Sequence, residues 1–268
     1  MPIIKAGDIN LYYEIHGTGR PLVLIRGFGS NSAHWNHQVP EFSRRFQTLV
    51  FDNRGIGRSD KPDYPYTISM LAGDVANLLD ALGLDRVFLL GLSMGGMIAQ
   101  RFALDYPDRL AGLVLAATHC GGAHAVQPSE KIKKTMTDLV MGVSPDEAVK
   151  MSRELMFTED TERDRPELLK EYLELSQRYP NDLKMLLNQL AALNGHDAHE
   201  DLPRLKTPTL VLTGDQDALV PPENATILAD RIPGARLTVI EGGAHQFLVE
   251  QDRAFNQAVI AFLTALDG

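Results

Sequence analysis

Residues 87–105 read Val-Phe-Leu-Leu-Gly-Leu-Ser-Met-Gly-Gly-Met-Ile-Ala-Gln-Arg-Phe-Ala-Leu-Asp. The first four are apolar and have strand character, whereas the residues after position 96 show the apolar spacing of a helix. Gly91-Leu-Ser93-Met-Gly95 lies between them, so the segment predicts a strand, a sharp turn and a helix. The two flanking glycines let the strand and the helix pack closely. We therefore expect Ser93 to project from the carboxyl end of a strand, the position of a catalytic nucleophile.

The composition is that of a globular protein. Of 268 residues, 44% are hydrophobic and 23% charged, enough for one large core or for a core with an inserted subdomain. The formal net charge of -9 should repel nucleic-acid phosphates, so we expect no nucleic-acid partner. The single cysteine, Cys120, excludes an internal disulfide. Because we find neither a signal-peptide-like stretch nor an apolar run of transmembrane length, we expect no membrane association and a cytoplasmic location.

Short apolar runs separated by helix-length stretches indicate an α/β protein. Four runs are apolar at both alternating positions, which is typical of strands buried on both sides of a parallel sheet: residues 22–25, 48–51, 87–90 and 110–116. Further strands are predicted at residues 209–213, 236–240 and 11–15, the last paired with residues 3–4. Helices are predicted at residues 31–45, 67–82, 94–106, 222–232 and 252–266. The alternation predicts a doubly wound, mostly parallel sheet.

A helical insert interrupts this alternation. From about residue 119 to residue 203 we find no strand-like run, only helical segments at residues 129–141, 145–157, 166–179 and 182–193. Ser144 has the character of an N-cap for the second of these, with a proline at the first helical position and acids in the first turn. We therefore predict a core domain of residues 1–119 and 204–268, with a helical cap insert of residues 120–203.

Candidate catalytic groups follow the predicted strands at their carboxyl ends, where open α/β sheets gather them. Ser93 follows one strand, and Asp215 and Asp217 follow a later one. His245 follows the last strand. The order along the chain is therefore serine, acid, histidine.

In these motifs and their order the chain resembles the α/β-hydrolase fold family, with its inserted helical cap. The resemblance implies that Ser93 is the nucleophile, Asp217 the acid of a Gly-x-x-Asp-x-x-x-Pro turn, and His245 the base. Asp215 lies two residues earlier and is the rival acid. The resemblance also implies that the backbone N–H groups of Phe28 and Met94 form the oxyanion hole.

A serine hydroxyl needs a neutral imidazole to accept its proton, and histidine both takes and returns protons near neutral pH. We therefore predict a cofactor-free serine hydrolase of a small carboxylic ester or lactone, similar to carboxylesterases and 3-oxoadipate enol-lactone hydrolases. Three alternatives stay open: a carbon–carbon bond hydrolase of vinylogous diketones, a perhydrolase or haloperoxidase activity, and a non-catalytic small-molecule binding protein. The aspartate-nucleophile branches are disfavoured because position 93 is serine. Monomer and homodimer are both compatible with the sequence.

The substrate pocket should be apolar, because five of nine methionines fall in the insert and thioethers adapt to varied shapes. Its candidate lining residues are Gly27, Trp35, Met97, His119, Met136 and Met141.

Arg26 stands where many relatives carry histidine. Two hypotheses apply to it: recognition of an anionic substrate, or a structural ion pair with Asp52 or Glu241. A metal site is not indicated, since the possible ligands lack a persuasive spacing: His196, His199, Glu200 and Asp201. No nucleotide-binding glycine motif is present either, so no cofactor is expected.

Overall fold

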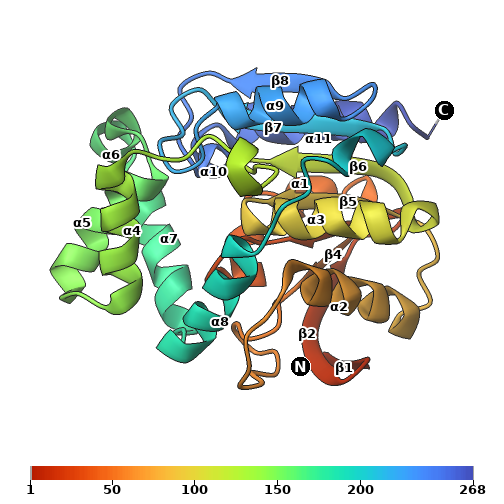
Figure 1. Ribbon diagram of the computed structural model, residues 1–268, viewed down its shortest axis with the longest axis horizontal. Coiled ribbons are helices and arrows are strands. Elements are labelled where there is room, and N and C mark those ends of the chain that lie inside the picture. Colours follow the sequence, from red (N-terminus) through yellow and green to blue (C-terminus); the bar gives the residue numbers. More distant parts are fainter. Residues whose placement is uncertain (1, 268) are drawn as a thin grey trace.

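The computed structural model describes residues 2–267, except for the side chain of Pro145. One eight-stranded sheet has the order β1-β2-β4-β3-β5-β6-β7-β8 (Figure 1). Its strands are β1 (Ile3–Ala6), β2 (Ile9–His16), β3 (Arg20–Ile25), β4 (Phe46–Phe51), β5 (Val87–Leu92), β6 (Leu110–Ala116), β7 (Thr209–Gly214) and β8 (Arg236–Ile240). β1 and β2 pair in antiparallel fashion and the strands from β4 onward are parallel, which confirms the predicted fold class.

The α-helices follow the predicted order with three differences. The helices are η1 (Ser32–Trp35), α1 (Val39–Phe42), α2 (Ile68–Ala81), α3 (Met94–Asp105), η2 (Pro107–Arg109), η3 (Gly122–His124), α4 (Glu130–Met141), α5 (Pro145–Met156), α6 (Glu159–Asp164), α7 (Pro166–Arg178), α8 (Leu183–Asn194), η4 (Leu202–Arg204), α9 (Glu223–Arg231), α10 (Phe247–Glu250) and α11 (Asp252–Thr264). The single helix predicted at residues 31–45 is wrong, because Pro40 cannot donate a backbone hydrogen bond and the chain forms two short helices instead. The sequence also did not indicate the short helices α6 and α10.

Each central strand contributes to two cores. In β3, Val23 and Ile25 pack in the core shared with α2, α3 and α9, whereas Leu22 and Leu24 pack in the core shared with α1 and α11. All four side chains are fully buried. This is why the strands are apolar at both alternating positions, since each side of the sheet is covered by helices.

The strand register places several strand ends at one edge of the sheet. Ile25 of β3 lies opposite Gly91 of β5, and Leu92 lies opposite Ala116 of β6. Because these strands are parallel and adjacent, the loops that follow them meet at the same edge.

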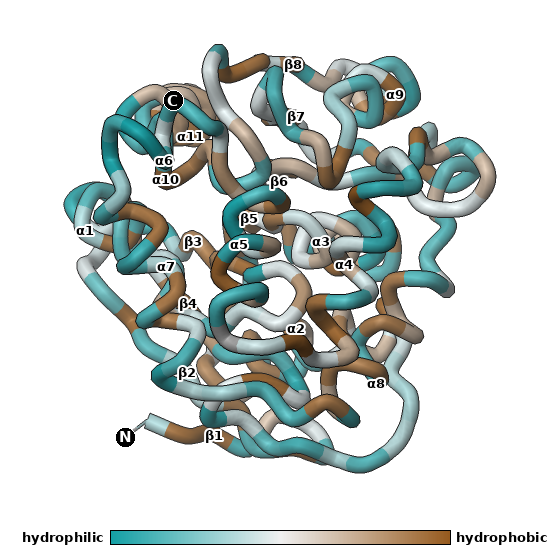
Figure 2. Tube along the Cα trace, turned by 90° about the vertical axis from the view of Figure 1, so that its left-hand side faces the viewer, coloured by the Kyte–Doolittle hydropathy of each residue, from teal (hydrophilic) through white to brown (hydrophobic). Residues whose placement is uncertain are grey.

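Five helices, α4 to α8, lie between β6 and β7 in the chain (Figure 1). Hydrophobic and hydrophilic positions alternate along these helices, as expected when each has one apolar face (Figure 2). The N-cap predicted at Ser144 is confirmed, since its side chain and that of Glu147 form a capping box. No helix within residues 2–267 combines the length and the hydropathy needed to span a bilayer.

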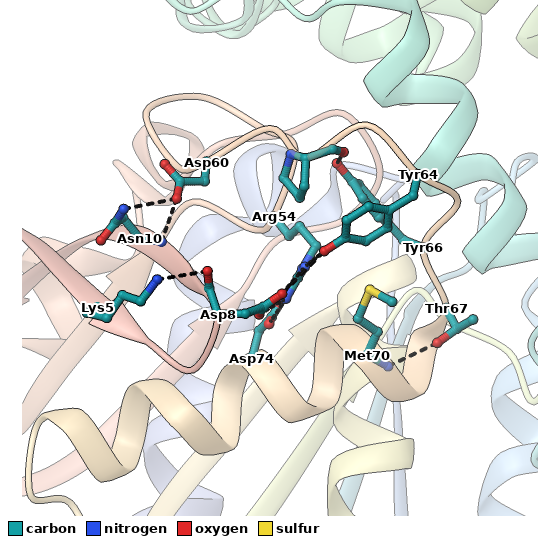
Figure 3. Close-up of polar contacts among 11 residues, drawn as sticks. Lys5, Asp8, Asn10, Arg54, Asp60, Tyr64, Tyr66, Thr67, Met70 and Asp74 are labelled. Atoms are coloured by element: carbon teal, nitrogen blue, oxygen red, sulfur yellow. Dashed lines mark hydrogen bonds and ion pairs between the residues drawn. The ribbon is translucent and has the colours of Figure 1, made fainter.

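A polar cluster around Arg54 joins three distant segments (Figure 3). The buried guanidinium donates to Asp74 of α2 (Nε to Oδ2, 2.8 Å), to Asp8 of the β1–β2 turn (Nη2 to Oδ1, 2.9 Å) and to the hydroxyl of Tyr64. The hydrogen bond from Arg54 lowers the pKa of Asp8. The cluster anchors the turn after β4 to α2 and to the β1–β2 turn.

Candidate active site

Ser93 occupies a strained turn between β5 and α3. Its φ of 57° and ψ of −122° lie outside the regions that non-glycine residues favour. The turn needs glycine on both sides: a Cβ on Gly91 would lie 2.2 Å from the carbonyl oxygen of Gly95, and one on Gly95 would lie 2.2 Å from that of Ile25. The sequence pattern therefore reflects a close approach of strand and helix that larger residues would prevent.

The backbone of Ser93 is held on both sides. Its N–H donates to the carbonyl of Ala116 (2.9 Å), and its own carbonyl accepts from the hydroxyl of Thr118 (2.8 Å). The residue stands at the N-terminus of α3, where the helix dipole favours negative charge. The side chain lines a cavity of about 390 Å³, which we name the Ser93 cavity.

His245 is paired with Asp217. Its Nδ1 lies 2.8 Å from Oδ2 of Asp217, and both side chains are almost completely buried. The other carboxylate oxygen of Asp217 accepts the backbone N–H groups of Leu219 (3.0 Å) and Val220 (2.8 Å). Because an ionised carboxylate only accepts, Nδ1 of His245 carries the proton and Nε2 is left as an acceptor.

The rival acid, Asp215, is used differently. It is exposed, and its Oδ1 accepts the backbone N–H groups of Gly242 (2.8 Å) and Gly243 (3.3 Å). Asp215 therefore stabilises the loop before His245 and makes no hydrogen bond with that imidazole in the described structure.

His245 also lines the Ser93 cavity. The structure shows no hydrogen bond between its ring and Ser93 Oγ, although both face the same space. Contacts of this kind are often long before substrate binds and tighten in the complex.

Two backbone N–H groups are available beside Ser93. Those of Phe28 and Met94 donate to no acceptor among the described residues, and the N–H of Met94 begins a helix. The loop that carries Phe28 is close to the serine, because a Cβ on Gly27 would lie 3.0 Å from Cβ of Ser93. Both N–H groups thus belong to segments that lie beside Ser93.

Four of the six predicted pocket residues line the Ser93 cavity: Gly27, Met97, His119 and Met136. Helices α4, α5, α7 and α8 supply about half of the remaining wall, with apolar side chains such as Leu139, Leu155, Met156 and Leu193. The sequence did not identify these positions individually, since an apolar helix face looks the same whether it meets a core or a cavity.

Trp35 and Met141 do not line the cavity, so their prediction as pocket residues is wrong. Trp35 is fully buried in the core shared with α1 and α11. Met141 is 59% exposed. It follows Met136 by five residues, which turns a helix by about 140° and points its side chain away from the cavity.

Arg26 forms neither of the predicted ion pairs. It is 1% exposed, donates to Oε1 of Gln246 (3.2 Å) and to the carbonyl of His34 (3.4 Å), and lies over the ring of Trp35 (4.8 Å). Asp52 pairs instead with Arg58 (Nε to Oδ2, 2.9 Å). Burial lowers the pKa of Arg26 to about 10, so its charge persists at neutral pH.

The loop of His245 is tied to the inserted helices by residues that the sequence did not single out. Glu250 accepts the backbone N–H of Ala244 (2.6 Å) through one oxygen and that of Thr158 (2.7 Å) through the other. The backbone N–H of Gln246 donates to the carbonyl of Met156 (2.9 Å). These contacts connect the position of the imidazole to that of α5 and α6.

The possible metal ligands are only partly brought together. His196 is buried and apart, while His199 and Glu200 meet His124, with ligand atoms within 4.8 Å of one another. The rings of His124 and His199 are stacked, 3.6 Å apart and inclined by 10°. Lone pairs lie in the ring planes, so one ion cannot lie in both planes while the rings stack.

The fold and this arrangement have known counterparts. Residues 20–252 match the alpha/beta hydrolase fold family, and the chain belongs to that family. It is a hydrolase of this fold. The chain is 30% identical to the "Putative carbamate hydrolase RutD" of Azorhizobium caulinodans, over 100% of both chains.

Two solved structures are similar over nearly their whole length. The enol-lactonase from Burkholderia xenovorans LB400 has a TM-score of 0.87 and 28% identity, covering 98% of this chain and 100% of that chain. A thermophilic esterase from Thermogutta terrifontis has a TM-score of 0.86 and 30% identity, covering 99% and 98%.

Proposed function

We propose that this protein is a serine hydrolase that cleaves a small carboxylic ester or lactone through an acyl-enzyme on Ser93. The observation that carries the proposal is the 2.8 Å contact of His245 Nδ1 with Asp217, which leaves Nε2 as a base in the cavity that Ser93 lines. The similarity to an esterase and to an enol-lactonase supports the choice of bond.

The reaction begins when Nε2 of His245 takes the proton of Ser93 Oγ, and the oxygen attacks the substrate carbonyl. The N–H groups of Phe28 and Met94 stabilise the oxyanion that forms. His245 then gives its proton to the leaving alcohol, and the acyl group stays on Ser93 as an ester. A water molecule, deprotonated by the same imidazole, releases the acid and restores the serine. Asp217 keeps the imidazole in the required tautomer and stabilises its charged form.

Residues 120–203 act as the cap of this site. Their helices supply apolar side chains to a cavity of about 390 Å³, which suits a small substrate with apolar groups. A cytoplasmic location stays a prediction from the sequence.

The experiment is a panel of p-nitrophenyl acyl esters, lactones, carbamates and vinylogous diketones, assayed with the wild type and with Ser93→Ala. A fluorophosphonate probe labels the nucleophile in parallel. We expect ester or lactone turnover and probe labelling in the wild type, and neither in the variant.

Turnover unchanged in Ser93→Ala would refute the serine mechanism. Cleavage of the diketones alone would identify a carbon–carbon bond hydrolase. Binding of panel compounds without any turnover would identify a binding protein.

A further inference from the structure

His119 lines the Ser93 cavity but has no role in the proposed reaction. It follows β6, the strand that pairs with β5 on one side and with β7 on the other. Two residues earlier, Ala117 has a positive φ of 43°, and the hydroxyl of Thr118 donates to the carbonyl of Ser93. The backbone turn after β6 is therefore built against the nucleophile and directs His119 toward the same space.

The ring of His119 is held in one tautomer. The backbone N–H of Gly121 donates to its Nδ1 (3.0 Å), and Nε2 of Gln100 donates to its carbonyl (3.1 Å). A backbone N–H can only donate, so Nδ1 carries no proton. In the neutral ring the proton is therefore on Nε2, which makes no hydrogen bond with the residues that the structure describes.

His119 also lacks charge at neutral pH. Burial, together with the nearby imidazole of His245, lowers its pKa to about 4. The ring therefore presents a fixed N–H donor in the cavity and cannot serve as a second base. An N–H donor without a protein partner in a partly buried cavity favours a ligand that supplies an acceptor.

The strand order shows which half of the substrate meets this donor. The oxyanion donor Phe28 follows β3, on one side of β5, whereas β6, β7 and β8 lie on the other side. His245 must reach the leaving oxygen in order to protonate it. The alcohol half of an ester therefore extends toward the His245 side of Ser93. His119 follows β6, which is on that side, and lines the same cavity as His245.

We infer that Nε2–H of His119 donates a hydrogen bond to an oxygen acceptor in the alcohol half of the substrate, so that the enzyme prefers esters whose alcohol carries an ether or carbonyl oxygen, and lactones with a second ring or side-chain oxygen there. This inference rests on the proposed function and specifies its substrate class. His119 thus determines specificity and takes no part in proton transfer.

The test compares 2-methoxyethyl butyrate with n-butyl butyrate, which differ by one oxygen in place of a methylene. Both form the same butyryl-enzyme, so their kcat/KM values differ only in the acylation step, where the alcohol is present. We expect His119→Leu to lower the preference for the methoxyethyl ester about tenfold relative to wild type. His119→Gln, whose amide nitrogen replaces Nε2, should retain part of the preference.

His124→Leu is the matched control, because His124 is exposed and does not line the cavity. It should keep both rates. Equal losses on the two esters in His119→Leu would overturn the inference and leave the proposed function intact. If the wild type hydrolysed neither ester, this result would contradict the proposed function and, with it, the inference.

A second measurement observes the tautomer of His119 directly in the wild type. Nitrogen-15 spectra of the histidine-labelled wild type at pH 7 should show His119 as the neutral Nε2–H tautomer, assigned by the signals lost in His119→Gln. The Nδ1–H tautomer, or a protonated ring, would overturn the inference.

Discussion

Replacing Asp217 with asparagine changes the tautomer of His245 with little change in shape. The oxygen that accepts from the N–H groups of Leu219 and Val220 must stay an oxygen, so the new amide nitrogen takes the place of Oδ2 and faces Nδ1 of His245. That nitrogen can only donate, which forces the imidazole proton onto Nε2. Nε2 of His245 then carries a proton and can no longer accept the proton of Ser93, while the backbone hydrogen bonds of the loop remain.

We expect kcat on a p-nitrophenyl ester to fall by about four decades, the loss seen for the equivalent change in serine proteases. This corresponds to about 5 kcal/mol of transition-state stabilisation at ~1.4 kcal/mol per decade. The melting temperature should change little. Asp215→Asn is the control, because within residues 2–267 that carboxylate accepts only from the loop of Gly242 and Gly243. A loss in Asp215→Asn as large as that in Asp217→Asn would refute the assignment of the acid.

Three further predictions concern packing, Arg26 and pH. Gly95→Ala should destabilise the protein by about 3 kcal/mol or more, since its Cβ would lie 2.2 Å from a carbonyl oxygen of β3, and an unchanged urea midpoint would contradict this. Arg26 lines the Ser93 cavity, but its guanidinium already donates to Gln246 and to the carbonyl of His34. Arg26→Met should therefore lower kcat/KM equally for a neutral and a carboxylate-bearing ester; a selective loss on the anionic ester would show that Arg26 recognises substrate. Burial lowers the pKa of His34 to about 3 and that of His196 to about 4. Each of these histidines takes up a proton near pH 6.5 in the unfolded chain but stays neutral in the folded chain at pH 5. Each should therefore lower the free energy of unfolding by about 2 kcal/mol at pH 5 relative to neutral pH. Urea unfolding at pH 7 and pH 5 checks this, with His34→Gln expected to lose less than wild type.

The alternation of strands and helices could be predicted because it depends on local patterns. Strand β3 is apolar at successive positions because both of its faces are covered, and that signal is present in four residues of sequence. The division of residues 31–45 into two short helices was not predicted, although Pro40 itself indicates a break in a helix.

The pocket was harder to predict than the catalytic candidates. Met136 and Met141 have the same chemistry and lie in the same helix, but only their angular separation and the position of the helix decide which one faces the cavity. Trp35, in the short helix η1, was a plausible residue for the pocket wall. Its ring packs against Arg26 instead and lies inside a core.

The sequence by itself determined the α/β fold, the turn that exposes Ser93 and the order in which serine, acid and histidine follow the strands, because these depend on contacts between residues near in the chain. The family resemblance already favoured Asp217 as the acid. Only the tertiary structure decided that Asp217 contacts His245 while Asp215 binds the loop of Gly242 and Gly243, that Arg26 meets Gln246 without a carboxylate, and that His119 presents one N–H to the cavity. These outcomes depend on which side chains from different strands and loops come within hydrogen-bonding distance, and distances of that kind are set by the packing of the whole sheet and its helices.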